Sequence, residues 1–198
     1  MRLLLDNIPN TLTLIRIASI PVFVVVFYLP FSWSNDVATA IFAFAALTDW
    51  LDGYLARRLE QISPFGAFLD PVADKLTVAV ALVLLVQVDE KGWMVLPAII
   101  IIGREIAVSA LREWMAGIGE RTKVAVSVIG KIKTTFQMVA ILLLLYREPI
   151  GDFPTHDVGV VLLYAAAILT LWSMYLYLRA AWPALSGENG GSGNDTPQ

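Results

Sequence analysis

The sequence has 198 residues, of which 58% are hydrophobic and only 16% are charged, and its mean hydropathy is +0.70. Because an average soluble domain carries roughly 25% charged residues, this composition argues against an ordinary soluble domain and indicates an integral membrane protein. The formal net charge of −3 says little about partners, and the absence of cysteine excludes disulfides, thiolate chemistry and cysteine-based metal sites.

Six apolar segments follow one another along the chain, each close to the roughly 20 residues that cross a bilayer as a helix. They cover approximately residues 11–29, 37–57, 66–88, 93–114, 125–146 and 158–181. A short amphipathic segment at the membrane interface is expected before the first of them, and a polar, glycine-rich stretch follows the last. The sequence therefore predicts an all-α integral membrane domain of six transmembrane helices over residues 1–183, and a disordered tail over residues 184–198.

The basic residues of the connections and helix ends predict the orientation in the membrane, because short cytoplasmic loops carry an excess of Lys and Arg. One side collects most of them, namely Arg2, Arg57, Arg58, Arg121, Lys123 and Arg179, whereas the other has only Lys91 and Arg147. This bias predicts that both termini and the second and fourth connections are cytoplasmic. Four tryptophans would form the interfacial belts, Trp33 and Trp93 outside, Trp114 and Trp182 inside.

Four aspartates flank the connection between the second and third predicted helices: Asp49, Asp52, Asp70 and Asp74. Spacings of three and four residues place each pair on one helix face. Because the two helices are antiparallel, Asp49 and Asp74 both lie about 12 Å from the cytoplasmic helix ends, with the other pair nearer those ends. A carboxylate costs roughly 2.5–3.5 kcal/mol in the bilayer, and four of them repel one another unless cations intervene. Oxygen ligands without His or Cys favour Mg²⁺ or Mn²⁺, and two ions would suit phosphoryl transfer.

Gly53, Ala56 and Gly66 continue the faces that carry these aspartates. Small residues in a membrane helix allow close packing of a neighbouring helix, and they equally allow a flat ligand to approach the backbone. From the residues, both interpretations stay open.

The spacing Asp49-x2-Asp52-Gly53-x2-Ala56-Arg57-x8-Gly66-x3-Asp70-x3-Asp74 resembles the complete motif of the CDP-alcohol phosphotransferase family. The segments "NIPNTLTLIRI", "REIAVSALREWMA" and "GKIKTTFQM" resemble the bacterial members that transfer the phosphatidyl group of CDP-diacylglycerol to sn-glycerol 3-phosphate, giving phosphatidylglycerophosphate and CMP. The resemblance implies a metal-dependent transferase of anionic phospholipid biosynthesis, usually a homodimer. It also implies the bacterial cytoplasmic (inner) membrane, with the active site on the cytoplasmic side and no nucleic-acid partner.

The resemblance also implies roles for the motif residues. Asp49, Asp52, Asp70 and Asp74 would bind two ions of Mg²⁺ or Mn²⁺, and Asp74 would also act as the general base for the sn-1 hydroxyl of the acceptor. The residues expected to line the CDP site are Asp49, Asp52, Gly53, Ala56, Arg57 and Gly66.

The acceptor brings a phosphate dianion, so its pocket requires cations close to the aspartates. We expect four residues of the fourth and fifth predicted helices to contribute: Arg104, Arg112, Lys131 and Lys133. Arg16 lies at a similar depth and could converge on the same region. As alternatives, Arg112 and Lys133 would extend to the interface, and Glu105 or Glu113 would pair with Arg104.

Two other functions are compatible with the sequence. The same CDP-lipid chemistry could serve another acceptor alcohol, because the motif specifies the donor and not the acceptor. An ion or metal transporter would also carry acids within the membrane, although the acids here occupy one depth and no internal repeat is evident.

Overall fold

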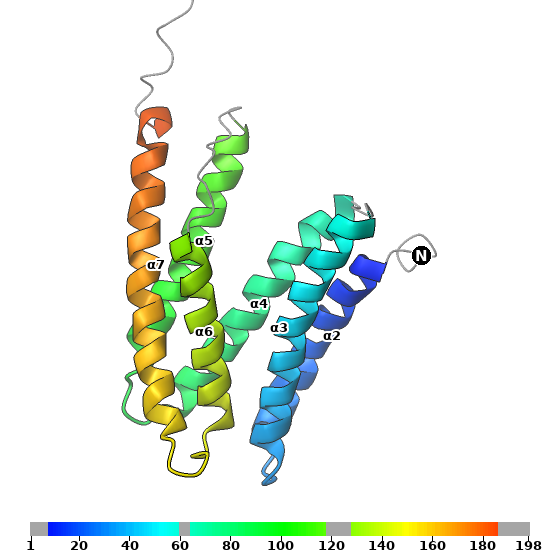
Figure 1. Cartoon of the computed structure of the whole chain (residues 1–198), viewed down its shortest axis with the longest axis vertical. Coiled ribbons are helices and arrows are strands. Elements are labelled where there is room, and N and C mark those ends of the chain that lie inside the picture. Colours follow the sequence, from blue (N-terminus) through cyan, green and yellow to red (C-terminus); the bar gives the residue numbers. More distant parts are fainter. Residues whose placement is uncertain (1–7, 60–63, 118–127, 186–198) are drawn as a thin grey trace, which may run out of the picture.

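The computed structural model describes the backbone of residues 8–59, 64–117 and 128–185. Within these ranges it describes the side chains except those of residues 8–10, 50–59, 64–67, 128, 129, 131 and 183–185. The described residues form six helices (Figure 1). They are α2 (Ile8–Tyr28), α3 (Ser34–Leu59), α4 (Pro64–Val88), α5 (Val95–Gly117), α6 (Val128–Tyr146) and α7 (Thr155–Leu185). All six predicted segments are therefore helical, with ends within four residues of the prediction. The amphipathic lead-in and the tail lie largely outside the described residues.

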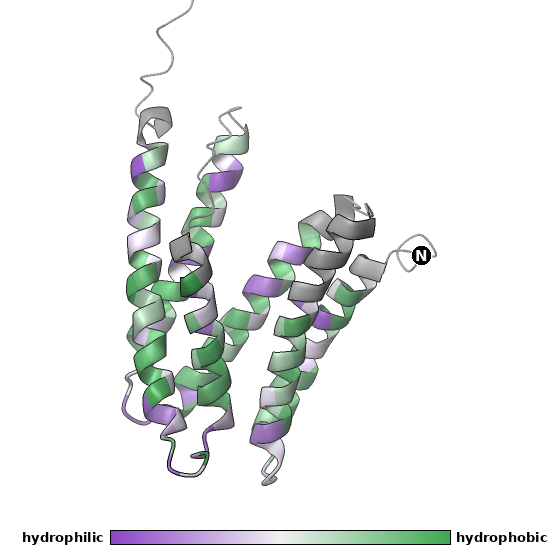
Figure 2. Ribbon diagram, viewed as in Figure 1, coloured by the Kyte–Doolittle hydropathy of each residue, from purple (hydrophilic) through white to green (hydrophobic). Residues whose placement is uncertain are grey.

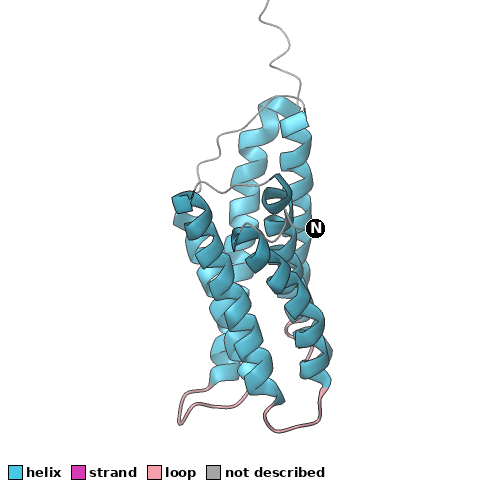
Figure 3. Cartoon of the chain, turned by 90° about the vertical axis from the view of Figure 1, so that its right-hand side faces the viewer, coloured by secondary structure: helices cyan, strands magenta, loops and turns pink. Residues whose placement is uncertain are grey.

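The helices alternate in direction, so that α2, α4 and α6 begin at the end of the molecule where α3, α5 and α7 finish (Figure 1). The described connections lie together at the opposite end (Figure 3). Helix α2 packs on α3 and α4, whereas α7 packs on α5 and α6. Contacts of α6 with α3 and of α4 with α5 and α6 join these two groups. Helix α4 begins beside α2 and α3 and crosses toward α5 and α6 (Figure 1). Asp70 and Asp74 lie in the N-terminal half of this helix.

The apolar core lies between the two groups. Phe42 of α3, Leu85 of α4 and Ile141 of α6 are at most 1% exposed and belong to one contiguous buried cluster. Because lipid is as apolar as these side chains, close van der Waals packing within the cluster, rather than removal of apolar surface from water, holds the groups together.

The outer surface of the helices is also apolar. Three helices are long and apolar enough to cross a membrane, over Thr11–Tyr28, Phe68–Val88 and Thr155–Trp182, within the described part of the chain. Only 28%, 39% and 33% of these spans are buried inside the protein, so most of their apolar residues face outward. Hydrophobic residues, shown in green, predominate in the helix bodies, and polar residues gather at the connections at the bottom of the view (Figure 2). Such a surface is stable in lipid, and the chain is a helical membrane protein.

Exposed tryptophans lie at both ends of the bundle. Trp33 and Trp93 lie in the α2–α3 and α4–α5 connections, whereas Trp114 and Trp182 lie near the ends of α5 and α7. This distribution matches the two interfacial belts predicted from the sequence.

Candidate active site

Helix α2 carries two fully buried polar side chains, Thr13 and Arg16, which are 0% and 1% exposed. Their spacing of three residues places them on one face of the helix. Arg16 Nη1 donates a hydrogen bond to Asp49 Oδ1 of α3 over 2.8 Å, and Thr13 Oγ1 donates one to Asp70 Oδ1 of α4. One helix therefore holds a carboxylate from each of two others. The expectation that Arg16 converges on the region of the aspartates is confirmed, although its guanidinium is buried against Asp49 and does not line the larger polar cavity described below.

Asp74 lies one helical turn after Asp70. It lines a small cavity together with Arg16 of α2, Ala45 of α3 and Met138 of α6. Asp49, Asp70 and Asp74 are thus gathered around two polar residues of α2. The side chain of Asp52, the fourth predicted acid, lies outside the described residues.

The aspartates Asp49, Asp70 and Asp74, called the acid group below, suit a cation both in their charge and in their donor atoms. Asp49 is bonded to Arg16, Asp70 is bonded to Thr13, and Asp74 lines the small cavity beside Arg16. These three carboxylates are accompanied by one buried guanidinium, so negative charge is in excess, and oxygen-only donor sets favour Mg²⁺ or Mn²⁺. Among the side chains that are described, no three acidic or histidine residues come close enough together to enclose a metal ion. The side chain of Asp52, the fourth predicted ligand, lies outside that comparison.

A polar cavity of about 280 Å³ lies between α4, α5 and α6. Arg104, Arg112 and Lys133, three of the four cations predicted for the acceptor, line this cavity together with Asp74. The side chain of the fourth, Lys131, lies outside the described residues. The tertiary structure therefore brings cations from two helices to Asp74, for which the resemblance implies the role of general base.

Glu105 organises the cations of this cavity. Arg104 Nη1 and Lys133 Nζ both donate to Glu105 Oε1 over 2.8 Å. The pairing of Arg104 with Glu105, one of the two alternatives considered from the sequence, is confirmed, and Lys133 shares the same oxygen. Lys133 is 5% exposed, so it does not extend to the interface. Glu105 holds both cations at the cavity wall and offsets part of their charge.

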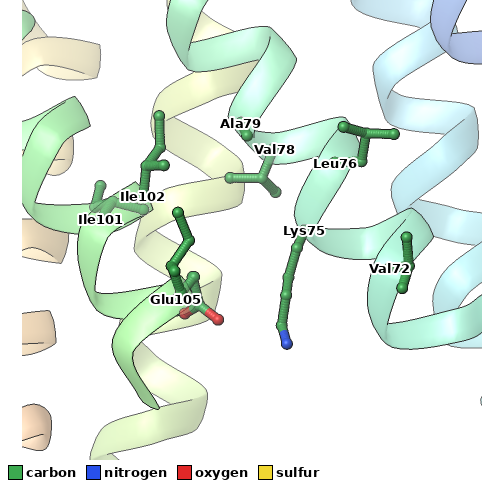
Figure 4. Close-up of a pocket in the computed structure, with 9 residues that line it drawn as sticks. Val72, Lys75, Leu76, Val78, Ala79, Ile101, Ile102 and Glu105 are labelled. Carbon is green, nitrogen blue, oxygen red and sulfur yellow. The ribbon is translucent and has the colours of Figure 1, made fainter. Parts of the chain in front are cut away.

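Lys75 is a further cation of the cavity, which the sequence analysis did not single out. It lines the polar cavity and also an apolar groove of about 290 Å³ between α4 and α5. Figure 4 shows Lys75 and Glu105 at one end of this groove, below the apolar side chains of Val78 and Ile102. Lys75 Nζ donates a hydrogen bond to Ser109 Oγ of α5. The lysine directly follows Asp74, and that adjacency was the only signal in the sequence.

The cavity has a positive balance of charge among its described lining residues. Four cations, from Lys75, Arg104, Arg112 and Lys133, face two carboxylates, those of Asp74 and Glu105. Such a balance favours an anionic ligand. The acid group and the cationic cavity share Asp74, which lines both cavities.

The other predicted site residues lie on α3 and α4, where only their backbone is described: Gly53, Ala56, Arg57 and Gly66. His156, the single histidine of the sequence, lies in the first turn of α7 at the opposite end of the bundle, as a surface residue beside Asp157.

The chain was compared with known proteins. Residues 6–172 match the model of a family described as CDP-alcohol phosphatidyltransferase. A protein of Pectobacterium atrosepticum is 58% identical over 88% of this chain and 94% of its own length. A Pseudomonas fluorescens protein is 58% identical over 92% of this chain and 93% of its own. A Yersinia enterocolitica protein is 56% identical over 90% and 97%. All three are named CDP-diacylglycerol–glycerol-3-phosphate 3-phosphatidyltransferase.

Proposed function

Because the chain belongs to the CDP-alcohol phosphatidyltransferase family, we propose that it transfers the phosphatidyl group of CDP-diacylglycerol to sn-glycerol 3-phosphate. The products are phosphatidylglycerophosphate and CMP. The observation that carries this proposal is the identity of 56–58% over 88–92% of the chain with three proteins named for this reaction. The cationic cavity beside Asp74 supports it independently, because glycerol 3-phosphate brings both a dianion and the hydroxyl that reacts.

We assign the donor to the acid group and the acceptor to the polar cavity. The acids on α3 and α4 face the donor, and the cations on α5 and α6 bind the acceptor phosphate by charge-assisted hydrogen bonds. Asp74 lines the polar cavity and also the small cavity beside Arg16, which supports the proposal that the two substrates meet at this residue. Holding both reactants at one point replaces a bimolecular encounter by a positioned one.

The reaction follows from this arrangement. Asp74 takes the proton of the sn-1 hydroxyl while that oxygen forms a bond to the β-phosphorus of the donor. The bond from this phosphorus to the pyrophosphate bridging oxygen breaks, and CMP leaves with the electron pair. Arg16 keeps Asp49 in place, and Thr13 does the same for Asp70. Asp49, Asp52, Asp70 and Asp74 would hold two ions of Mg²⁺ or Mn²⁺, which supply electrostatic stabilisation of the charge on the pyrophosphate. Gly53, Ala56, Arg57 and Gly66 complete the proposed CDP site.

The proposal places all six helices across the bacterial inner membrane, with both termini and the active site on the cytoplasmic side. The bias of basic residues toward one side supports this orientation, and the two tryptophan belts support a membrane-spanning arrangement. A lipid donor and a water-soluble acceptor then meet within the cytoplasmic leaflet. A homodimer is proposed from the family resemblance, and native mass spectrometry of the protein in detergent measures it directly.

The assay of the proposed function measures CMP release by purified protein from CDP-diacylglycerol and sn-glycerol 3-phosphate with Mg²⁺. We expect release by the wild type and a loss of at least about a hundredfold in Asp74→Asn, because general-base catalysis contributes 10²–10⁴-fold. Asp157→Asn is the matched control, since this exposed carboxylate lies at the opposite end of the bundle. No release with glycerol 3-phosphate, but release with another alcohol, would assign a different acceptor.

A further inference from the structure

Gln137 of α6 is a polar residue with an unmet hydrogen-bonding requirement. The residue is 5% exposed, and its Oε1 is shielded from solvent without a hydrogen-bond partner among the described residues. A buried acceptor without a partner destabilises the protein, and a structure rarely retains one without a reason. The side chain lines the polar cavity that also contains Asp74 and Lys133. A ligand in this cavity is therefore the natural source of the missing donor.

The position of Gln137 on α6 narrows the choice of donor. Gly130, Lys133, Thr134, Gln137 and Met138 all line the cavity, so one face of α6 forms its wall. Gln137 lies one turn beyond Lys133, about 6 Å along the helix axis. Met138, the next residue, also lines the small cavity beside Arg16 and Asp74. Gln137 consequently lies at the end of the cavity nearer Asp74, and Lys133 lies nearer the N-terminal end of α6.

The chemistry of the acceptor supplies the donor that this position requires. Glycerol 3-phosphate carries, in order, a phosphate on C3, a hydroxyl on C2 and the reacting hydroxyl on C1. A phosphate dianion has no hydrogen to donate, and the C1 hydroxyl gives its proton to Asp74. The C2 hydroxyl remains, and it lies between the groups assigned to Lys133 and to Asp74.

We propose that Gln137 is a specificity-determining residue whose amide oxygen accepts a hydrogen bond from the C2 hydroxyl of the acceptor. The inference depends on the proposed function. Rotation about the last torsion angle of glutamine is soft, so the amide turns toward the ligand at little cost. An acceptor without this hydroxyl leaves the buried oxygen unpaired, and sites of this kind discriminate strongly against such analogues. Gln137 thereby selects a hydroxylated three-carbon phosphate over its deoxy analogue.

The test compares sn-glycerol 3-phosphate with 3-hydroxypropyl phosphate, which keeps the phosphate and the primary hydroxyl but lacks the C2 hydroxyl. CMP release gives kcat/KM for each acceptor, in the wild type and in Gln137→Met, whose unbranched side chain has a similar length. We expect the wild type to prefer glycerol 3-phosphate by at least about tenfold, the loss expected for one hydrogen bond to a buried group. In Gln137→Met this ratio falls to about one, because activity with glycerol 3-phosphate decreases while activity with the analogue is retained.

Thr170→Val is the matched control. Thr170 of α7 is also fully buried, with a hydroxyl that lacks a partner among the described residues, but it does not line the polar cavity. This variant should keep the wild-type ratio. An equal loss with both acceptors in Gln137→Met would show a merely structural role and overturn the inference, as would a wild-type ratio near one. Because a wild-type ratio near one overturns the inference by itself, the test remains decisive against it even if Gln137→Met fails to fold. Absence of CMP with both acceptors in the wild type would instead overturn the proposed function.

Discussion

Replacing Arg16 with methionine removes the positive charge that lies among the carboxylates of α3 and α4. Arg16 is 1% exposed, whereas the side chain of its partner Asp49 is 42% exposed. Breaking a fully buried ion pair costs about 3–5 kcal/mol, and a hydrogen bond to a charged group contributes about 1.5–3 kcal/mol. Because Asp49 is accessible to water, the pair is better described by the range for a hydrogen bond to a charged group, about 1.5–3 kcal/mol. We expect Arg16→Met to lower the free energy of unfolding by about 2 kcal/mol, or the Tm by about 4–8 °C.

A double-mutant cycle assigns this loss to the pair. The free energy of unfolding is measured in mild detergent by denaturant titration for the wild type, Arg16→Met, Asp49→Asn and the double variant. The coupling energy should be about 2 kcal/mol, because either single change leaves a charge without its partner. Arg179→Met, which removes an exposed arginine of α7, should change stability by at most about 0.5 kcal/mol. Single effects that add to within about 0.5 kcal/mol would refute the assignment of Arg16 to Asp49.

Two further predictions use the described contacts. Gly159→Ala adds a Cβ only 2.8 Å from Leu144 Cγ at the α6–α7 contact, which should lower the free energy of unfolding by about 1–3 kcal/mol. Gly103→Ala meets nothing within 4 Å and should be neutral or stabilising, so an equal loss in both variants would contradict the packing. Lys133→Met should raise the KM for glycerol 3-phosphate about 10- to 100-fold without changing that for CDP-diacylglycerol, because it removes a charged hydrogen bond. Lys91→Met, at the opposite end of the bundle, is its control, and an unchanged KM in Lys133→Met would exclude the cavity as the acceptor site.

The helices and the positions of the acids along them were predictable because both depend on local rules. In lipid, a backbone must satisfy its hydrogen bonds within the segment, so long apolar runs become helices. The rise and period of a helix then place Asp70 and Asp74 on one face of α4. The same reasoning placed Asp49 at a matching depth on α3, without any knowledge of how the helices pack.

The partners of the buried cations were not predictable in this way. The depth of Arg16 in the membrane was compatible with a place in the acceptor-substrate pocket, yet packing of α2 on α3 and α4 directs its side chain to Asp49. Lys133 was compatible with an interfacial position, yet the approach of α6 to α5 buries it against Glu105. Such pairings join residues that are 28 and 33 positions apart. They depend on which helix faces touch, and helical periodicity does not specify that.

The composition and motif spacing alone were sufficient for the membrane class, the helix order, the shared faces of the acids and the resemblance to the family. The packing of six helices was required to divide the charged residues into an acid group and a cationic cavity, with Asp74 in both. It was also required to find Lys75 and Gln137, because the only signal in the sequence was that Lys75 directly follows Asp74. The physical reason is that the energy of a buried polar group depends on the partners within hydrogen-bonding distance, and here those partners come from other helices.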